Sequence, residues 1–234
     1  MPRLLVHVEG QTEETFVNDV LCEHLTRSGY SSVSARLVGN PRLRSHRGGI
    51  RSWQSVQKDI LRHLKEDAGA VATTMVDYYA LPQNWPGRAE APSKSSSSSK
   101  AEWVETALLA NIVEEMGPRL DQRRFVPLVV MHEFEALLFS DPDRFAQGIG
   151  RDDLANQLRA IRQDFETPED INDSPETAPS KRIKNLYPGY EKPLSGVVAA
   201  MEIGLAVIRR ECPHFNGWLN CLEALPAVFS AHTY

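Results

Sequence analysis

The sequence lacks the features that mark membrane proteins and disulfide-stabilised secreted proteins. Three of its 234 residues are cysteine, which is too few for a disulfide framework. No apolar run approaches the roughly 20 residues that a membrane-spanning helix needs. The apolar start of the chain ends at Glu9 and is too short for a signal peptide. We therefore expect a cytosolic protein with no membrane partner.

The sequence also has too little positive charge for a general nucleic-acid coat. It carries 26 Lys and Arg against 31 Asp and Glu, a formal net charge of −5. The positive charge is concentrated in residues 36–65, where Asp59 is the one acid. This segment is either a surface that binds a polyanion or a solvated loop followed by the polar face of a helix.

Short apolar segments and amphipathic segments alternate along the first 131 residues. Apolar or alternating segments predict strands over residues 3–8, 31–38, 70–76 and 125–131. Apolar residues at helical spacing predict helices over residues 12–28, 50–65 and 101–116, the first with Thr12 as N-cap. Alternating strands and helices are typical of an α/β fold. We predict an open, mainly parallel four-stranded sheet with helices on both faces.

The remaining segments predict a loop and a C-terminal extension. Residues 81–100 contain three prolines and a run of serines, which predicts a mobile surface loop within an α/β core of residues 1–140. Residues 141–234 predict a mostly helical extension. Its clearest helices are residues 154–165 and 194–210, on either side of the proline-rich stretch 167–193.

Acidic residues follow three of the four predicted strands: Glu9 and Glu13 the first, Asp77 the third, and Glu133 and Glu135 the fourth. Ligands of open parallel sheets bind beyond the carboxyl ends of the strands, so these side chains are expected to meet there. Crowded carboxylates repel one another unless a cation neutralises them, and oxygen ligands suit Mg²⁺ or Mn²⁺. The sequence therefore predicts a metal site.

Each acid also has a purely structural explanation. Glu13 favours the dipole of its helix, and Asp77 is a residue type that caps turns. Glu133 and Glu135 flank Phe134, so strand alternation alone would turn both of them outward.

Several segments of the chain resemble known families. Val8-Glu9-Gly10-Gln11-Thr12-Glu13 resembles the opening motif of TOPRIM domains, particularly those of overcoming-lysogenization-defect nucleases and related phage-defence proteins. Those domains place a glutamate after strand one and acids after strand three, and they bind Mg²⁺ there. This segment, Val76–Pro82 and His132–Phe139 are more closely similar to the bacterial domain-of-unknown-function 4276 family, which Ala178–Ile183 also fits. The resemblance spans most of the chain.

The resemblance implies a TOPRIM-like core with Glu9 as general acid/base or metal ligand and Asp77 as metal ligand. TOPRIM domains usually carry Asp-x-Asp after strand three, whereas this chain has Asp77-Tyr78-Tyr79. Either Glu133 or Glu135 replaces the second aspartate, or one metal binds, or the site is not catalytic.

The leading hypothesis is a Mg²⁺- or Mn²⁺-dependent nuclease, or a related phosphodiester-processing enzyme, acting on DNA or RNA in a phage-defence setting. Glu9, Asp77 and Glu135 would be catalytic, and Glu133 and Glu13 further metal ligands. The residues expected to hold phosphate are Arg42, Arg44, Arg47, Arg51, Lys181 and Arg182.

The rival hypothesis is a non-catalytic TOPRIM-like subunit, an effector or sensor in an ATPase-containing complex, because related families often lie beside an ATPase gene. A nucleotide-binding protein is disfavoured because neither Gly-x-x-x-x-Gly-Lys-Ser/Thr nor Gly-x-Gly-x-x-Gly occurs. The sequence leaves the oligomeric state open.

Overall fold

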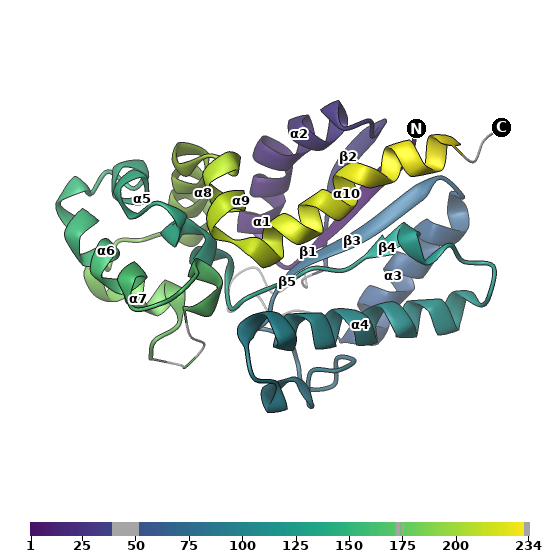
Figure 1. Ribbon diagram of the computed structural model, residues 1–234, viewed down its shortest axis with the longest axis horizontal. Helices are drawn as coiled ribbons and strands as arrows, with labels where there is room; N and C mark the ends of the chain where they lie inside the picture. Colours follow the sequence, from purple (N-terminus) through teal and green to yellow (C-terminus); the bar gives the residue numbers. More distant parts are fainter. Residues whose placement is uncertain (39–51, 172–173, 175, 232–234) are drawn as a thin grey trace.

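The computed structural model describes residues 1–38, 52–171, 174 and 176–231 (Figure 1). Four of the residues expected to hold phosphate, Arg42, Arg44, Arg47 and Arg51, lie outside the described residues. No helix of the described ranges combines the length and apolar character needed to cross a membrane.

The centre of the fold is a parallel sheet. Its described strands are β1 (Arg3–Val8), β2 (Ser32–Leu37), β3 (Ala70–Asp77), β4 (Phe125–Val126) and β5 (Val129–Val130). The order is β2-β1-β3-β4, and β5 also pairs with β3. The fourth predicted strand is two short strands because Pro127, which has no N–H to donate to the ladder, lies between them. The predicted α/β fold is confirmed.

One continuous helical stretch follows β1. It consists of α1 (Gln11–Phe16), the π-helical η1 (Val17–Leu21) and α2 (Cys22–Arg27). Its N-cap is Gly10, so the prediction of Thr12 was wrong by two residues; Thr12 lies inside the first turn. The next helices are α3 (Trp53–Glu66) and α4 (Ser97–Met116). Helix α4 begins four residues before its predicted start because Ser96 caps it, accepting a hydrogen bond from the Ser99 N–H.

The C-terminal part of the chain is helical, as expected. Its elements are η5 (Phe134–Ser140), α5 (Pro142–Gly148), η6 (Asp152–Leu154), α6 (Ala155–Gln163), η7 (Pro168–Asp170), α7 (Pro179–Leu186), α8 (Lys192–Ile203), α9 (Leu205–Glu211) and α10 (Pro213–Ala231). The predicted helix 194–210 is divided at Gly204, whose φ of +84° separates α8 from α9. Figure 1 shows α5 to α8 at one end of the sheet and α10 running back along it.

Each face of the sheet has its own hydrophobic core. Helices α1, α2 and α10 cover one face, and α3 and α4 cover the other (Figure 1). Along β3, Val71 and Met75 belong to the first core, whereas Ala72 and Val76 belong to the second. Because side chains alternate along a strand, Asp77 leaves the sheet on the same side as Met75, towards α1 and α10.

The segment predicted as a surface loop, residues 81–100, packs closely on the second core. Leu81, Trp85 and Ala91 are buried there, and η3 (Ala91–Ser93) precedes α4. The ring of Trp85 lies 5.1 Å from that of Trp53 on α3. These side chains therefore anchor the segment to the second core, while residues such as Gln83, Asn84 and Glu90 are exposed at the surface.

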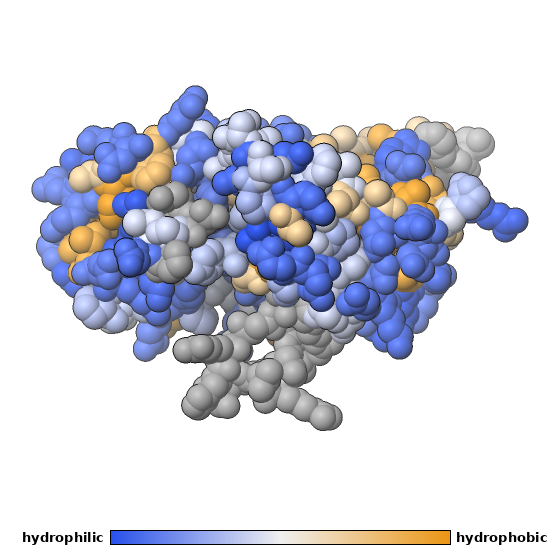
Figure 2. All heavy atoms as spheres, turned by 90° about the horizontal axis from the view of Figure 1, so that it is seen from below, coloured by the Kyte–Doolittle hydropathy of each residue, from blue (hydrophilic) through white to orange (hydrophobic). Residues whose placement is uncertain are grey.

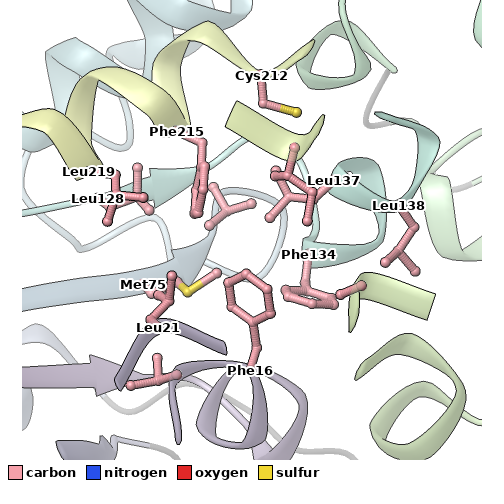
Figure 3. Close-up of a cluster of buried hydrophobic side chains, with 14 of the residues drawn as sticks. Phe16, Leu21, Met75, Leu128, Phe134, Leu137, Leu138, Cys212, Phe215 and Leu219 are labelled. Atoms are coloured by element: carbon pink, nitrogen blue, oxygen red, sulfur yellow. The ribbon is translucent and has the colours of Figure 1, made fainter. Parts of the chain in front are cut away.

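The C-terminal helices share the first core with the sheet. The Trp218 indole Nε1 of α10 donates to Thr73 Oγ1 of β3 at 2.9 Å, and the Tyr30 hydroxyl donates to the Leu222 carbonyl at 2.8 Å. Figure 3 shows Phe16 of α1, Phe134 of η5 and Phe215 of α10 meeting in this cluster. The described C-terminal helices therefore share one hydrophobic core with β1, β3 and α1.

The surface seen from below, turned by 90° from the first view, is mainly hydrophilic (Figure 2). Its hydrophobic residues gather in separate patches towards the two ends of the molecule rather than in one continuous area.

A buried histidine pair lies on the α3 side of β1. The Nδ1–H of His7 donates to the Thr73 carbonyl at 3.2 Å, and the ring centroids of His7 and His63 are 5.3 Å apart. Burial, with a further contribution from the charge of His63, lowers the pKa of His7 to about 4. The folded protein therefore holds this imidazole neutral.

Replacing Gly29 by alanine tests the docking of α10. Gly29 has φ of +111°, and a Cβ there would lie 3.0 Å from Pro226 Cβ of α10. Gly117 has φ of +77° and open space around its Cβ position. We expect Gly117→Ala to cost about 1–2 kcal/mol and Gly29→Ala about 1–3 kcal/mol more, measured by urea unfolding. Equal losses would show that α10 does not pack against this turn.

His7 should make stability depend on pH. Its folded pKa of about 4 lies below the usual 6.5, so the unfolded chain takes up a proton first as the pH falls. Stability is therefore lost between about pH 6.5 and 4. We expect the stability of His7→Phe relative to wild type to rise by about 2 kcal/mol from pH 7 to pH 5 in urea unfolding. A difference that does not change with pH would contradict this.

Candidate carboxylate–lysine site

The five acids predicted from the sequence come together at the carboxyl edge of the sheet. Glu9 directly follows β1, Glu13 lies in the first turn of α1, and Asp77 ends β3. Glu133 and Glu135 stand at the start of η5. Glu13, Asp77, Glu133 and Glu135 are at most 7 % exposed, and Glu9 is partly buried.

Glu133 and Glu135 reach the site by a route that strand alternation does not describe. The chain leaves β5 and turns into the 3₁₀ helix η5, so Glu133, Phe134 and Glu135 are all buried. The structural explanation in which both glutamates face outward was wrong.

Backbone N–H groups hold three of the carboxylates in place. Asp77 Oδ1 accepts from the Phe134 N–H at 2.9 Å, and Glu133 Oε2 accepts from the Ser180 N–H, in the first turn of α7, at 2.8 Å. Glu13 Oε2 accepts from the Gly10 N–H at 3.0 Å. Each carboxylate is thus oriented by a donor from a different loop or helix start, which stabilises its charged form.

Lys192, the first residue of α8, is a member of the site that the sequence did not reveal. Its Nζ lies 2.9 Å from Glu135 Oε2 and 3.7 Å from Glu133 Oε1. Although burial opposes the charge, the carboxylates of Glu135 and Asp77 raise the pKa of Lys192. A lysine in the first turn opposes the helix dipole. A lysine at the start of a helix was therefore the one feature of the sequence that indicated an acidic partner for Lys192.

The acids act strongly on one another. Burial, followed by the charge of Glu13, raises the pKa of Glu9 to about 8. Burial raises the pKa of Glu13 to about 7, with a further increase from Glu135. Burial, followed by the charges of Glu13 and Glu9, raises the pKa of Asp77 well above its usual value. Carboxylates that follow different strands therefore share one electrostatic environment.

Two carboxylate oxygens of the site have no partner among the described residues. They are Glu9 Oε2 and Glu135 Oε1, and both are buried. In the same described ranges, no three His, Cys, Asp or Glu side chains are set closely enough to hold a metal ion. The oxygen donors match Mg²⁺ or Mn²⁺ in kind and leave two oxygens available, but cation binding requires the carboxylates to turn towards one another.

Lys181 and Arg182, the two described residues expected to hold phosphate, lie on α7. Lys181 is exposed. Arg182 Nε donates to the Thr177 carbonyl at 2.8 Å, and its guanidinium lies 5.3 Å from the centre of the Phe165 ring. Among the described residues, α7 contacts the acids through the backbone N–H of Ser180, which donates to Glu133.

One family model matches most of the chain. It is described as a domain of unknown function, DUF4276, and it covers residues 8–223. The chain belongs to the DUF4276 family. No curated protein and no solved structure matches this DUF4276 chain.

The segments that carry the DUF4276 resemblance meet at the site. Val8–Glu13 supplies two carboxylates, Val76–Pro82 supplies Asp77, and His132–Phe139 supplies Glu133 and Glu135. The fourth segment, Ala178–Ile183, supplies the Ser180 N–H that binds Glu133. The motifs therefore converge on one arrangement of side chains, although they are far apart in the sequence.

Replacing Lys192 by methionine tests its role as counter-ion. The change leaves Glu135, which is 1 % exposed, without its ammonium partner. Because the Lys192 side chain is 37 % exposed, we expect a loss of about 2 kcal/mol in urea unfolding at pH 8, less than for a fully buried pair. Glu135→Gln in the same protein should restore most of it, and Lys181→Met should have little effect. Full stability of Lys192→Met would contradict this role.

Proposed function

We propose that the site binds Mg²⁺ or Mn²⁺ and that this DUF4276 chain is a metal-dependent nuclease, or a related phosphodiester-processing enzyme, with a TOPRIM-like core. One observation carries the proposal. The described part of the chain sets five carboxylates against the single ammonium group of Lys192, and two of the carboxylate oxygens are buried without a partner.

The energetic argument concerns excess buried negative charge. Such a cluster is unfavourable unless protons or a cation reduce its charge, which is what the raised pKa values of Glu9 and Asp77 express. Amides or apolar residues would fill the same space more stably. Carboxylates in this arrangement therefore indicate a binding site. Oxygen donors that carry this much negative charge select a divalent cation.

The residues present suit phosphodiester hydrolysis. A bound divalent cation would polarise the phosphoryl group and stabilise its developing charge. Glu9 and Asp77 would hold the cation, and Glu135 would accept a proton from the attacking water. The water oxygen forms a bond to phosphorus, the bond to the leaving oxygen breaks, and that oxygen takes up a proton from solvent. The ammonium of Lys192 would neutralise charge on the phosphate.

The expected substrate is nucleic acid, DNA or RNA. The support is the concentration of positive charge in the sequence between residues 36 and 65, although the protein as a whole is acidic.

A second function has support from the same site. Lys192 already neutralises part of the negative charge, and the residue two positions after Asp77 is Tyr79 rather than aspartate. In this alternative Lys192 is the permanent counter-ion of a non-catalytic TOPRIM-like subunit that works with an ATPase partner.

Mn²⁺ titration by calorimetry separates the two functions. We expect wild type to bind Mn²⁺ and Asp77→Asn to bind it at least tenfold more weakly, because the amide keeps an acceptor for the Phe134 N–H but loses the charge. Glu13→Gln should also weaken binding. Glu14→Gln, in the same turn of α1, is the matched control and should bind like wild type.

Cleavage of single-stranded DNA, duplex DNA and RNA is measured in the same buffers, with and without an ATPase partner. Mn²⁺ binding together with cleavage that Glu9→Gln abolishes supports the enzyme. Mn²⁺ binding without cleavage under any condition overturns the nuclease and leaves the cation site. No Mn²⁺ binding and no cleavage overturns the metal site and favours the non-catalytic subunit, in which Lys192 is the permanent counter-ion.

A further inference from the structure

A third unpartnered polar atom lies at the site, and it belongs to a residue outside the acidic cluster. Tyr190 precedes α8 by two residues, and its side chain is 3 % exposed. Its hydroxyl has no hydrogen-bond partner among the described residues. After burial itself, the charges of Glu135, Glu133 and Glu13, in that order, raise the pKa of Tyr190. The hydroxyl is therefore a protonated donor that senses the charge of these carboxylates.

Gly196 of α8 provides the space for this hydroxyl. A Cβ at Gly196 would lie 3.0 Å from the Tyr190 oxygen, 3.5 Å from Thr12 Cγ2 and 3.7 Å from Phe134 Cε1. The hydroxyl thus lies where α8, α1 and η5 meet. The helix has a glycine at a point where a side chain would crowd the oxygen, although glycine inside a helix is unfavourable by about 0.5–1 kcal/mol relative to alanine.

A buried hydroxyl in this position destabilises the folded protein unless it binds a ligand. A buried donor without a partner is unfavourable by about 1–3 kcal/mol, and phenylalanine would fill the same space without that penalty. The pair formed by the Tyr190 hydroxyl and Glu135 Oε1 is complementary, because one is an unpartnered donor and the other an unpartnered acceptor. Glu135 Oε2 is already bound to Lys192 at 2.9 Å, so Oε1 is the oxygen that remains available.

We propose that Tyr190 is a catalytic residue whose hydroxyl, together with Glu135 Oε1, orients the attacking water when cation and substrate bind, and that Gly196 gives the hydroxyl its room. This inference rests on the proposed function. The water accepts a hydrogen bond from Tyr190 and donates one to Glu135, which leaves a lone pair directed at phosphorus. As the oxygen–phosphorus bond forms, the donated proton passes to Glu135 and the bond to the leaving oxygen breaks. Tyr190 keeps its proton throughout.

The test is a double-mutant cycle of Tyr190→Phe and Gly196→Ala, with kcat, KM, Mn²⁺ affinity and the melting temperature of the metal-free protein measured for each variant. Tyr190→Phe should lower kcat roughly tenfold, as expected for one lost hydrogen bond in the transition state, with KM and Mn²⁺ affinity unchanged. Its melting temperature should equal or exceed that of wild type, because the change removes an unpartnered buried hydroxyl.

Gly196→Ala should lower kcat several-fold alone and have no further effect in the Tyr190→Phe protein, because phenylalanine has no oxygen for the new methyl group to displace. Matched controls are Tyr187→Phe, a tyrosine that lies near Arg151, and Gly217→Ala in α10, where a Cβ would meet nothing within 4 Å. Both controls should keep the kcat of wild type.

The outcomes separate this inference from the proposed function. Wild-type kcat in Tyr190→Phe, a lower melting temperature with unchanged kcat, or additive losses in the double variant overturn the inference and leave the function standing. Mn²⁺ binding without cleavage by wild type overturns the role of Tyr190 and leaves the cation site. Neither binding nor cleavage overturns the proposed function, and this inference with it.

Discussion

The accumulation of negative charge at the carboxyl edge of the sheet is the constraint on which this structure most depends. Three parallel strand ends bring buried and partly buried carboxylates into one electrostatic environment, which is unfavourable without compensation. The compensation is distributed. Backbone N–H groups of Gly10, Phe134 and Ser180 each bind a carboxylate, and Lys192 supplies a full positive charge. The α/β core supplies most of the carboxylates, and helices α7 and α8 supply the Ser180 N–H and the Lys192 ammonium that bind them.

Phe134 connects this charged edge to the hydrophobic core. Its N–H binds Asp77, while its ring packs edge-on against Phe16, with the ring centroids 5.2 Å apart (Figure 3). Phe16 in turn lies 6.3 Å from Phe215 of α10. A change in the packing of this aromatic cluster therefore alters the position of a carboxylate as well as the stability of the fold. Asp77 is held by the Phe134 N–H, whereas Glu9 and Glu135 each have an oxygen without a partner among the described residues.

Both proposals rest on the same physical observation. In a well-packed protein nearly all buried polar atoms have hydrogen-bond partners, so several unpartnered atoms in one place need an explanation. Here two carboxylate oxygens and a tyrosine hydroxyl lie around one group of acids, and they combine acceptors with a donor. A ligand that carries both positive charge and hydrogen-bonding oxygen satisfies all three, as a hydrated cation at a phosphodiester would.

The sequence by itself determined the strands, the parallel α/β architecture and the identity of the five acids. Apolar runs and alternation are local patterns, and the carboxyl ends of parallel strands necessarily share one edge. Tertiary structure alone decided that Glu133 and Glu135 turn inward through η5, that Lys192 reaches them from α8, and that Gly196 leaves room for the Tyr190 hydroxyl. The first two depend on contacts between residues 57 positions apart in the sequence, and the third on how Tyr190 packs against α8. None of the three leaves a periodic trace in the sequence.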